Sequence, residues 1–202
     1  SPNINMSINA NLSQNSNTKS VNLTLPTFQG NMDRIFPFEP KDKPKKGLIQ
    51  NINFQYSTRA ENRIQTTEDD LFTGKMFENS RTGIQHTIPL STNFKILKYF
   101  NMAASVNYLE VWQPKTIKYN DYNPTIGIAV KDTISGLKAF RTYNYGINMA
   151  TNIYGTVNFK GDGKIRSIRH TIRPSISYSS APSFDQYYDE YIIDADGNTR
   201  EY

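Results

Sequence analysis

The chain of 202 residues is 37% hydrophobic, carries a net charge of +5 and contains no cysteine. Without cysteine, these residues form no disulfide and supply no thiol nucleophile. The basic residues are scattered rather than gathered in one patch, so we expect no nucleic-acid partner. No apolar run approaches the ~18 residues that a membrane-spanning helix needs, and the sequence therefore predicts no such helix.

The first predicted strand has a strict two-residue rhythm. Its apolar side chains are Ile4, Met6, Ile8, Ala10 and Leu12. Asn or Ser occupies the positions between them. Since successive side chains of a β-strand point to opposite faces, this strand has one apolar face and one amide-rich face.

The same rhythm returns six more times along the chain. The seven predicted strands cover residues 4–12, 21–25, 51–57, 84–96, 101–108, 143–153 and 167–178. Most of them match the length of ~9–11 residues with which a tilted strand crosses a bilayer. Strands of soluble proteins are shorter, at about 5–6 residues.

This alternation is typical of a membrane barrel, whose outer face meets hydrocarbon while its inner face stays wet. We therefore predict an all-β protein, an antiparallel transmembrane β-barrel in the cell outer membrane. Bacterial single-chain barrels have even strand numbers, and an open sheet would leave unpaired edges in lipid. We expect residues 1–202 to be about seven strands of a larger barrel domain, with the single Trp112 and many Tyr and Phe in its interfacial girdles.

The predicted connections differ sharply in length. Short turns are expected at 15–19, 97–100 and 160–164, and long connections at 29–47, 60–79, 113–138 and from 183 onward. In outer-membrane barrels the long loops usually face outside. We therefore expect the external side to hold 60–79, 113–138 and 183–202, and the periplasmic side to hold 97–100, 160–164 and the basic connection 29–47.

Two prolines fall inside predicted strands. Proline lacks the N–H that a strand ladder uses, so it is confined to strand edges, strand starts and bulges. We expect a local bulge at Pro89 and another at Pro174.

Three stretches of the sequence resemble one family. They are Ile168–Tyr178 followed by Pro182-Ser183-Phe184, Leu23-Thr24-Leu25-Pro26 followed by Arg34–Phe38, and Tyr108–Trp112. The first contains an Arg-His pair, then Pro, then alternating Ser and Tyr. The chain is similar in these stretches to the barrel of LptD, the lipopolysaccharide-assembly protein of the outer membrane, in its Bacteroidota type. No counterpart of the family's periplasmic jellyroll domain is visible in the sequence.

The resemblance implies a translocon and not an enzyme. In this family, lipopolysaccharide arrives over periplasmic Lpt bridge proteins and enters the outer leaflet where the first and last barrel strands part. The implied partners are lipopolysaccharide, outer-membrane lipids, the bridge proteins and an LptE-like lipoprotein plug. No cofactor is implied.

Arg169 and Arg173 are the candidate binding residues. Both fall on the polar phase of the predicted strand 167–178, which is the lumen side of a barrel. Guanidinium groups bind phosphates in a bidentate manner, and lipopolysaccharide carries phosphates. We predict that they contact the substrate or a plug; the alternative is that they pair with carboxylates on neighbouring strands.

The sequence offers no catalytic or metal site. His86 and His170, the two histidines, lie on the apolar phase of their strands, which favours packed or interfacial side chains over a general base. The spacing of Asp194, Asp196 and Asn198 matches the first ligands of a calcium loop. The glycine that such a loop needs next is absent, so we favour an external hairpin turn.

Two other functions remain open from the sequence alone. Another outer-membrane barrel, such as a porin or nutrient transporter, would share the alternation but not the Ile168–Tyr178 stretch. A secreted β-sandwich adhesin would need charged side chains on its solvent faces, where this sequence has Asn, Ser and Thr.

Overall fold

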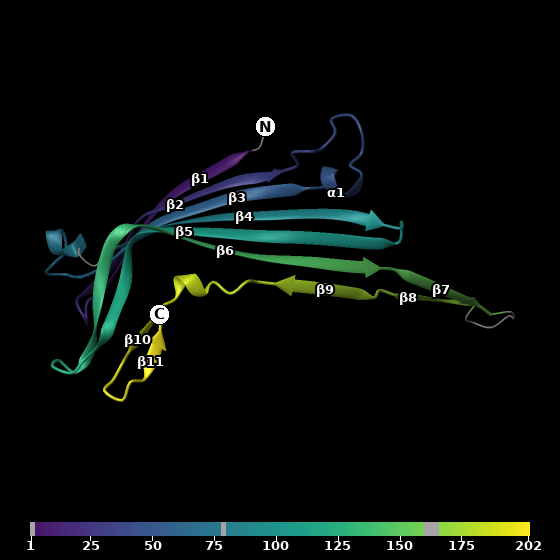
Figure 1. Cartoon of the computed structure of the whole chain (residues 1–202). Coiled ribbons are helices and arrows are strands. Elements are labelled where there is room, and N and C mark those ends of the chain that lie inside the picture. Colours follow the sequence, from purple (N-terminus) through teal and green to yellow (C-terminus); the bar gives the residue numbers. More distant parts are fainter. Residues whose placement is uncertain (1–2, 78–79, 160–165) are drawn as a thin grey trace.

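The computed structural model describes residues 3–77, 80–159 and 166–202, and it is all-β (Figure 1). One long, curved antiparallel sheet dominates it, and two small hairpins lie at the margins of the sheet. No helix in these described ranges is both long and apolar enough to cross a membrane. The predicted fold class is confirmed: the described residues form a large antiparallel sheet that does not close on itself, as expected for part of a larger barrel.

Most elements of the described part of the chain are strands. In order they are β1 (Ile4–Asn15), β2 (Ser20–Ile35), α1 (Gly47–Gln50), β3 (Asn53–Thr67), η1 (Gly74–Phe77), β4 (Arg81–Ile96), β5 (Phe100–Asn123), β6 (Ile128–Thr151), β7 (Ile153–Asn158), β8 (Ser167–Ile172), β9 (Ser175–Ser180), η2 (Asp185–Tyr187), β10 (Glu190–Ile192) and β11 (Thr199–Glu201).

The main sheet is a meander of neighbouring strands. Its order is β1-β2-β3-β4-β5-β6-β9, and every neighbouring pair is antiparallel. Each of the seven predicted segments contributes one strand to this sheet. The remaining strands form two hairpins, β7-β8 and β10-β11. Because β1 and β9 each have one neighbour in the sheet, they are its two edges.

The predicted loop at 113–138 is wrong. β5 continues to Asn123 and β6 begins at Ile128, so the connection is a turn at 124–127. β4 pairs with β5 only as far as Trp112. Beyond that point β5 pairs with β6 alone, and most side chains of this two-stranded ribbon are exposed, so no alternation of apolar and polar residues is needed to maintain it. The connections predicted at 29–47 and 60–79 also shorten, to 36–52 and 68–80, because β2 and β3 continue further than their alternation predicted.

The prolines act differently from the prediction. The pairing of β4 with β5 passes through Pro89 without a register shift, so the expected bulge there is wrong. Pro174 interrupts the predicted strand 167–178, which splits into β8 and β9. β2 has two register shifts against β3, one between Thr24 and Thr27, beside Pro26, and one between Met32 and Ile35. The expected turn at 160–164 falls outside the described residues.

Very little apolar surface is buried. Within the described part of the chain, the buried hydrophobic residues are Val21, Leu23, Ile64, Met76 and Tyr191. The first four form one cluster, where the 68–80 connection folds over the end of the sheet. Large apolar side chains elsewhere are half-buried or exposed, and Ile8 is 73% exposed. No second layer covers the described part of the main sheet, so the β-sandwich alternative is wrong.

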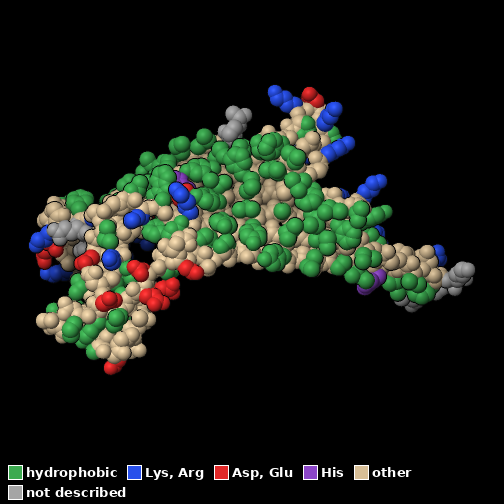
Figure 2. Space-filling model, in the orientation of Figure 1, with side chains coloured by type: hydrophobic (Ala, Val, Ile, Leu, Met, Phe, Trp, Pro, Cys, Tyr) green, Lys and Arg blue, Asp and Glu red, His purple; other side chains and the backbone are tan. Residues whose placement is uncertain are grey.

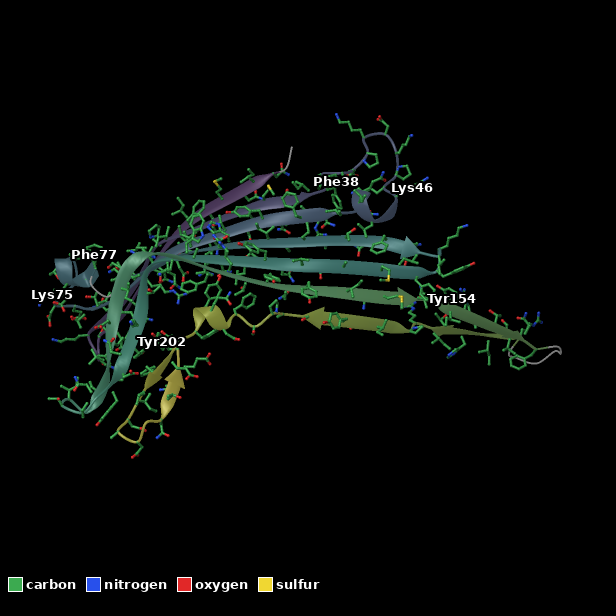
Figure 3. The ribbon with its side chains drawn as sticks, viewed as in Figure 1. Phe38, Lys46, Lys75, Phe77, Tyr154 and Tyr202 are labelled. Carbon is green, nitrogen blue, oxygen red and sulfur yellow. The ribbon has the colours of Figure 1, made fainter. Side chains whose placement is uncertain are left out.

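The connections lie at two opposite ends of the sheet (Figure 1). One end holds 16–19, 68–80, 124–127 and the C-terminal segment, and the other holds 36–52, 97–99 and the β7-β8 hairpin. Lys46 and Tyr154 mark the second end in Figure 3, while Lys75, Phe77 and Tyr202 mark the first.

Candidate functional site: the two faces of the sheet

The apolar face is built by the strand register, because partners across neighbouring strands share a face. Its rows run Ile8-Phe28-Ala60-Ile84-Trp112-Ala139, Met6-Gly30-Thr58-His86-Glu110-Arg141, Phe54-Leu90-Val106-Tyr145, Thr92-Ala104-Ile147-Tyr178, Phe94-Met102-Met149-Ile176 and Ile96-Phe100-Thr151. Figure 2 shows apolar side chains over the middle of the sheet, with most charged side chains toward its two ends. This is the distribution expected of a surface in contact with lipid.

The height of the apolar face matches a membrane. On β4 it extends from Ile84 to Ile96, which is about 40 Å along a strand that rises ~3.3 Å per residue. A strand tilt of roughly 35–45° reduces this to about 30 Å, enough for the ~25 Å apolar band of a barrel. β1 to β6, with 12 residues or more each, therefore have the length to cross a bilayer, whereas β9 has 6 residues.

Amphipathic aromatic side chains gather toward the end of the apolar face near the 68–80 connection. Tyr108 and Tyr143 are cross-strand partners, and Trp112 lies four residues further along β5. Tyr and Trp at this position are typical of the girdle at a membrane–water interface.

The opposite face of the sheet is mostly polar. Ser57 and Thr87 are cross-strand partners, and Asn107 donates a hydrogen bond to Asn144 at 2.9 Å. A shallow, open hollow on β2, β3 and β4 is lined by Gln29, Asn31, Ser57, Thr58, Arg59, Gln85 and Thr87. This polar face has the amide and hydroxyl groups expected of a wet barrel interior.

Alternating charges follow β3 on the polar face. The Glu61 carboxylate lies 2.7 Å from the Arg59 guanidinium and 2.8 Å from that of Arg63. Arg81 is the cross-strand partner of Arg63. The polar face therefore has more arginine than carboxylate at this point, which favours anionic ligands over cations.

The two arginines singled out in the sequence occupy different elements. Arg169 lies in β8 opposite Thr156, and its guanidinium carbon is 4.8 Å from the centre of the Tyr154 ring. Arg173 lies in the break between β8 and β9. Both are exposed, at the end of the sheet that also holds 36–52. The sequence did not anticipate the contact of Arg169 with an aromatic ring.

One ion pair interrupts the apolar face. Glu110 accepts hydrogen bonds from the Tyr108 hydroxyl (2.7 Å), the Trp112 indole (2.8 Å) and Arg141 Nε (3.1 Å). We call these four residues the Glu110 cluster. Sequence reasoning missed it, although Glu110 stands between two aromatic residues of the apolar phase and Arg141 precedes Tyr143 in the same phase.

His86 borders the Glu110 cluster. Its ring packs against Trp112 with centroids 4.5 Å apart, and its Nδ1 is 2.7 Å from the Tyr56 hydroxyl. The histidine is thus packed among aromatic residues, which confirms the interpretation from its phase. The described residues contain no group of His, Asp and Glu side chains that could hold a metal ion.

The Asp194 segment forms the turn of the β10-β11 hairpin, as expected from the sequence. The Asp194 carboxylate accepts hydrogen bonds from the Asn198 side chain and from the backbone N–H groups of Asp196 and Asn198. The hydrogen bond from the Asn198 side chain is the main reason why the pKa of Asp194 is lowered. Gly197 has a φ of +81°, a conformation that glycine adopts without strain.

A sheet with one membrane-high apolar face and one wet polar face defines the class of outer-membrane β-barrel proteins. A family model described as LptD protein matches residues 1–202. The chain belongs to the LptD family. No match was found among curated proteins or solved structures. As a member of this family, the chain is a lipopolysaccharide-transport-related protein of the outer membrane, in a family of transport and assembly proteins rather than enzymes.

Proposed function

We propose that this chain is part of the barrel wall of a translocon that inserts lipopolysaccharide into the outer leaflet. The proposal rests on the family match over the whole chain together with the two unlike faces of the sheet. The apolar face meets the lipid, and the polar face forms part of the path for the hydrophilic portion of lipopolysaccharide. Residues 1–202 belong to one barrel domain in this proposal.

The polar face has suitable chemistry for that path. Its amide and hydroxyl side chains form hydrogen bonds with sugars, and the surplus arginine around Glu61 suits phosphate. Arg169 and Arg173 lie further along, at the end that we assign to the periplasm, and contact phosphorylated substrate there or a lipoprotein plug. Upstream delivery falls to periplasmic Lpt bridge proteins.

Depletion of the full-length protein tests the proposal. Newly made lipopolysaccharide should fail to reach the cell surface, measured as loss of labelling by a membrane-impermeant reagent added to intact cells. Restoring the wild-type protein should return the signal. Normal surface lipopolysaccharide in depleted cells, together with slower uptake of small solutes, would instead favour a porin or nutrient transporter.

The two arginines have a separate test. Replacement of both Arg169 and Arg173 by Gln should slow the appearance of surface lipopolysaccharide without changing the amount of folded protein in the outer membrane. The matched control is Lys164→Gln combined with Arg166→Gln, which removes two positive charges from the same stretch of chain. Unchanged transport in the Arg169 and Arg173 double variant would leave these residues without a role in substrate contact.

A further inference from the structure

The Glu110 cluster is anomalous for a surface in contact with lipid. Across the described rows from Ile84 to Ile96, Glu110 and Arg141 are the only ionised side chains of the apolar face. A charge in contact with hydrocarbon is costly, and such residues face a partner or mark a functional site. The stability of the barrel alone therefore does not explain an ion pair at this position, which points to a functional role.

The hydrogen-bonding capacity of the Glu110 carboxylate is used within the protein, but that of the Arg141 guanidinium is used only in part. The carboxylate receives three hydrogen bonds and its side chain is 15% exposed. Arg141 donates one hydrogen bond to Glu110 through Nε, and its side chain is 62% exposed. Neither of its Nη groups has a hydrogen-bond partner among the described residues. These groups form the planar fork that binds a phosphate through two parallel hydrogen bonds.

The surroundings hold this fork in place. The backbone N–H of Arg141 donates to the Tyr187 hydroxyl at 3.0 Å, which ties β6 to η2. Trp112, a donor to Glu110, is packed against His86. The guanidinium is therefore anchored at Nε on a rigid strand, so little conformational entropy is lost when a ligand binds.

The depth of the cluster identifies the ligand. Arg141 lies in the row between those of Trp112 and Tyr143, at the aromatic end of the apolar face. Tyr and Trp of such a girdle sit at the level of lipid headgroups. We propose that Arg141, held by Glu110, binds the phosphate of a phosphorylated lipid in the surrounding leaflet, on the outer surface of the barrel wall. The inference relies on the proposed contact of this face with lipid, but not on transport.

Lipid retention by the purified full-length protein tests this site. The probes are bis-phosphorylated lipid A and the same lipid A after removal of its phosphates, and native mass spectrometry measures the fraction of protein that keeps each lipid. We expect the wild type to prefer the phosphorylated lipid and Arg141→Gln to bind it about tenfold more weakly, the loss of roughly one charge-assisted hydrogen-bonded contact. Arg141→Lys should be intermediate, because an ammonium group lacks the fork.

The controls separate the site from general charge and from misfolding. Lys138→Gln removes an exposed cation from the polar phase of the same strand and should bind like the wild type. The double variant Glu110→Gln with Arg141→Gln removes both charges, so it should fold, as judged by heat-modifiable gel mobility, and still bind weakly. If excess inorganic phosphate displaces bound lipid as strongly as excess lipid A does, the site binds free anions, and the lipid assignment is overturned.

Two outcomes distinguish this inference from the proposed function. Wild-type lipid A retention by folded Arg141→Gln protein overturns the inference and leaves the transport proposal standing. Phosphate-selective retention that depends on Arg141, in a protein whose depletion leaves surface lipopolysaccharide unchanged, supports the lipid site and overturns the transport proposal.

Discussion

At the scale of single residues, the same interaction occurs in two environments. Glu110 forms an ion pair with Arg141 on the apolar face, and Glu61 forms ion pairs with Arg59 and Arg63 on the polar face. On the polar face, water can replace a lost partner. At the lipid-facing site of Glu110 and Arg141 less water is available to do so, because the neighbouring hydrocarbon offers no hydrogen bonds. The two glutamates therefore form a natural pair for measuring how different the two faces are.

We expect Glu110→Gln to lower the unfolding temperature of the membrane-inserted protein by several degrees. The variant leaves the Arg141 charge without a counter-charge next to lipid. Glu61→Gln, the matched control, should change it much less, because Arg59 and Arg63 are hydrated. The measurement is the temperature at which the folded, fast-migrating form disappears on a gel. Equal shifts for the two variants would contradict the assignment of the faces.

Sequence reasoning assigned residues to the apolar phase well, but it missed which of them interact with one another across strands. The packed state of His86 follows from its phase alone. The bond between Glu110 and Arg141 does not, because it depends on the register of β5 against β6, which places residues 31 positions apart side by side. The available signal was one charge at the two-residue spacing just beyond each of two predicted strands, Glu110 after 101–108 and Arg141 before 143–153.

At the scale of elements, the strands were predictable wherever one face avoids water. The alternation of residues 84–96 and 101–108 identified β4 and the inner half of β5. Most side chains on both faces of the outer halves of β5 and β6 are exposed, so the composition there follows no period of two. Their pairing, for example of Ile117 with Thr133, is maintained by the backbone ladder.

The outer ribbon of β5 and β6 gains a further contact from the C-terminal hairpin. The Tyr119 ring stacks on Tyr191 at 4.5 Å and meets the edge of Tyr202 at 5.1 Å. The backbone N–H of Ile192 donates to the Asp121 carboxylate at 2.9 Å. The β10-β11 hairpin is thus fastened to β5 mainly by aromatic contacts.

We expect Tyr119→Ala to release this hairpin and to raise the rate of proteolysis within 193–198 about tenfold. The variant removes two aromatic pairs, each of which contributes ~0.5–1.5 kcal/mol. Cleavage becomes faster because its rate follows the population of the open form. Tyr188→Ala is the control, because this side chain is 57% exposed. Limited proteolysis followed by mass spectrometry gives both rates. An unchanged rate in Tyr119→Ala would mean that the aromatic contacts do not hold the hairpin.

At the scale of the whole molecule, we propose that the two ends of the sheet face different compartments. The end with the 124–127 turn and the C-terminal hairpin is assigned to the cell exterior, and the end with the basic 36–52 connection to the periplasm. The described sheet leaves β1 and β9 as edges. In a membrane, both edges must find partners, because lipid cannot hydrogen-bond to them.

Single cysteines report this orientation directly, since residues 1–202 contain none. Thr125→Cys, in the turn after β5, should react with a membrane-impermeant maleimide on intact cells. Lys43→Cys, in the basic connection, should react only after the outer membrane is permeabilised. The reverse pattern would invert the orientation while preserving the two faces.

The apolar face touches lipid in this structure's proposed setting, and Ala103 and Ala104 allow that contact to be tested. The two residues are neighbours on β5, both half-buried, with Ala104 on the apolar face beside Ile147 and Ala103 on the polar face beside Asn148. A charge near the middle of the lipid face costs about 2–4 kcal/mol, whereas lumen positions tolerate it. The measurement is the unfolding free energy of each variant in lipid vesicles. Our account predicts that Ala104→Arg loses about 2–4 kcal/mol and Ala103→Arg loses much less; equal losses, or a larger loss for Ala103→Arg, would contradict it.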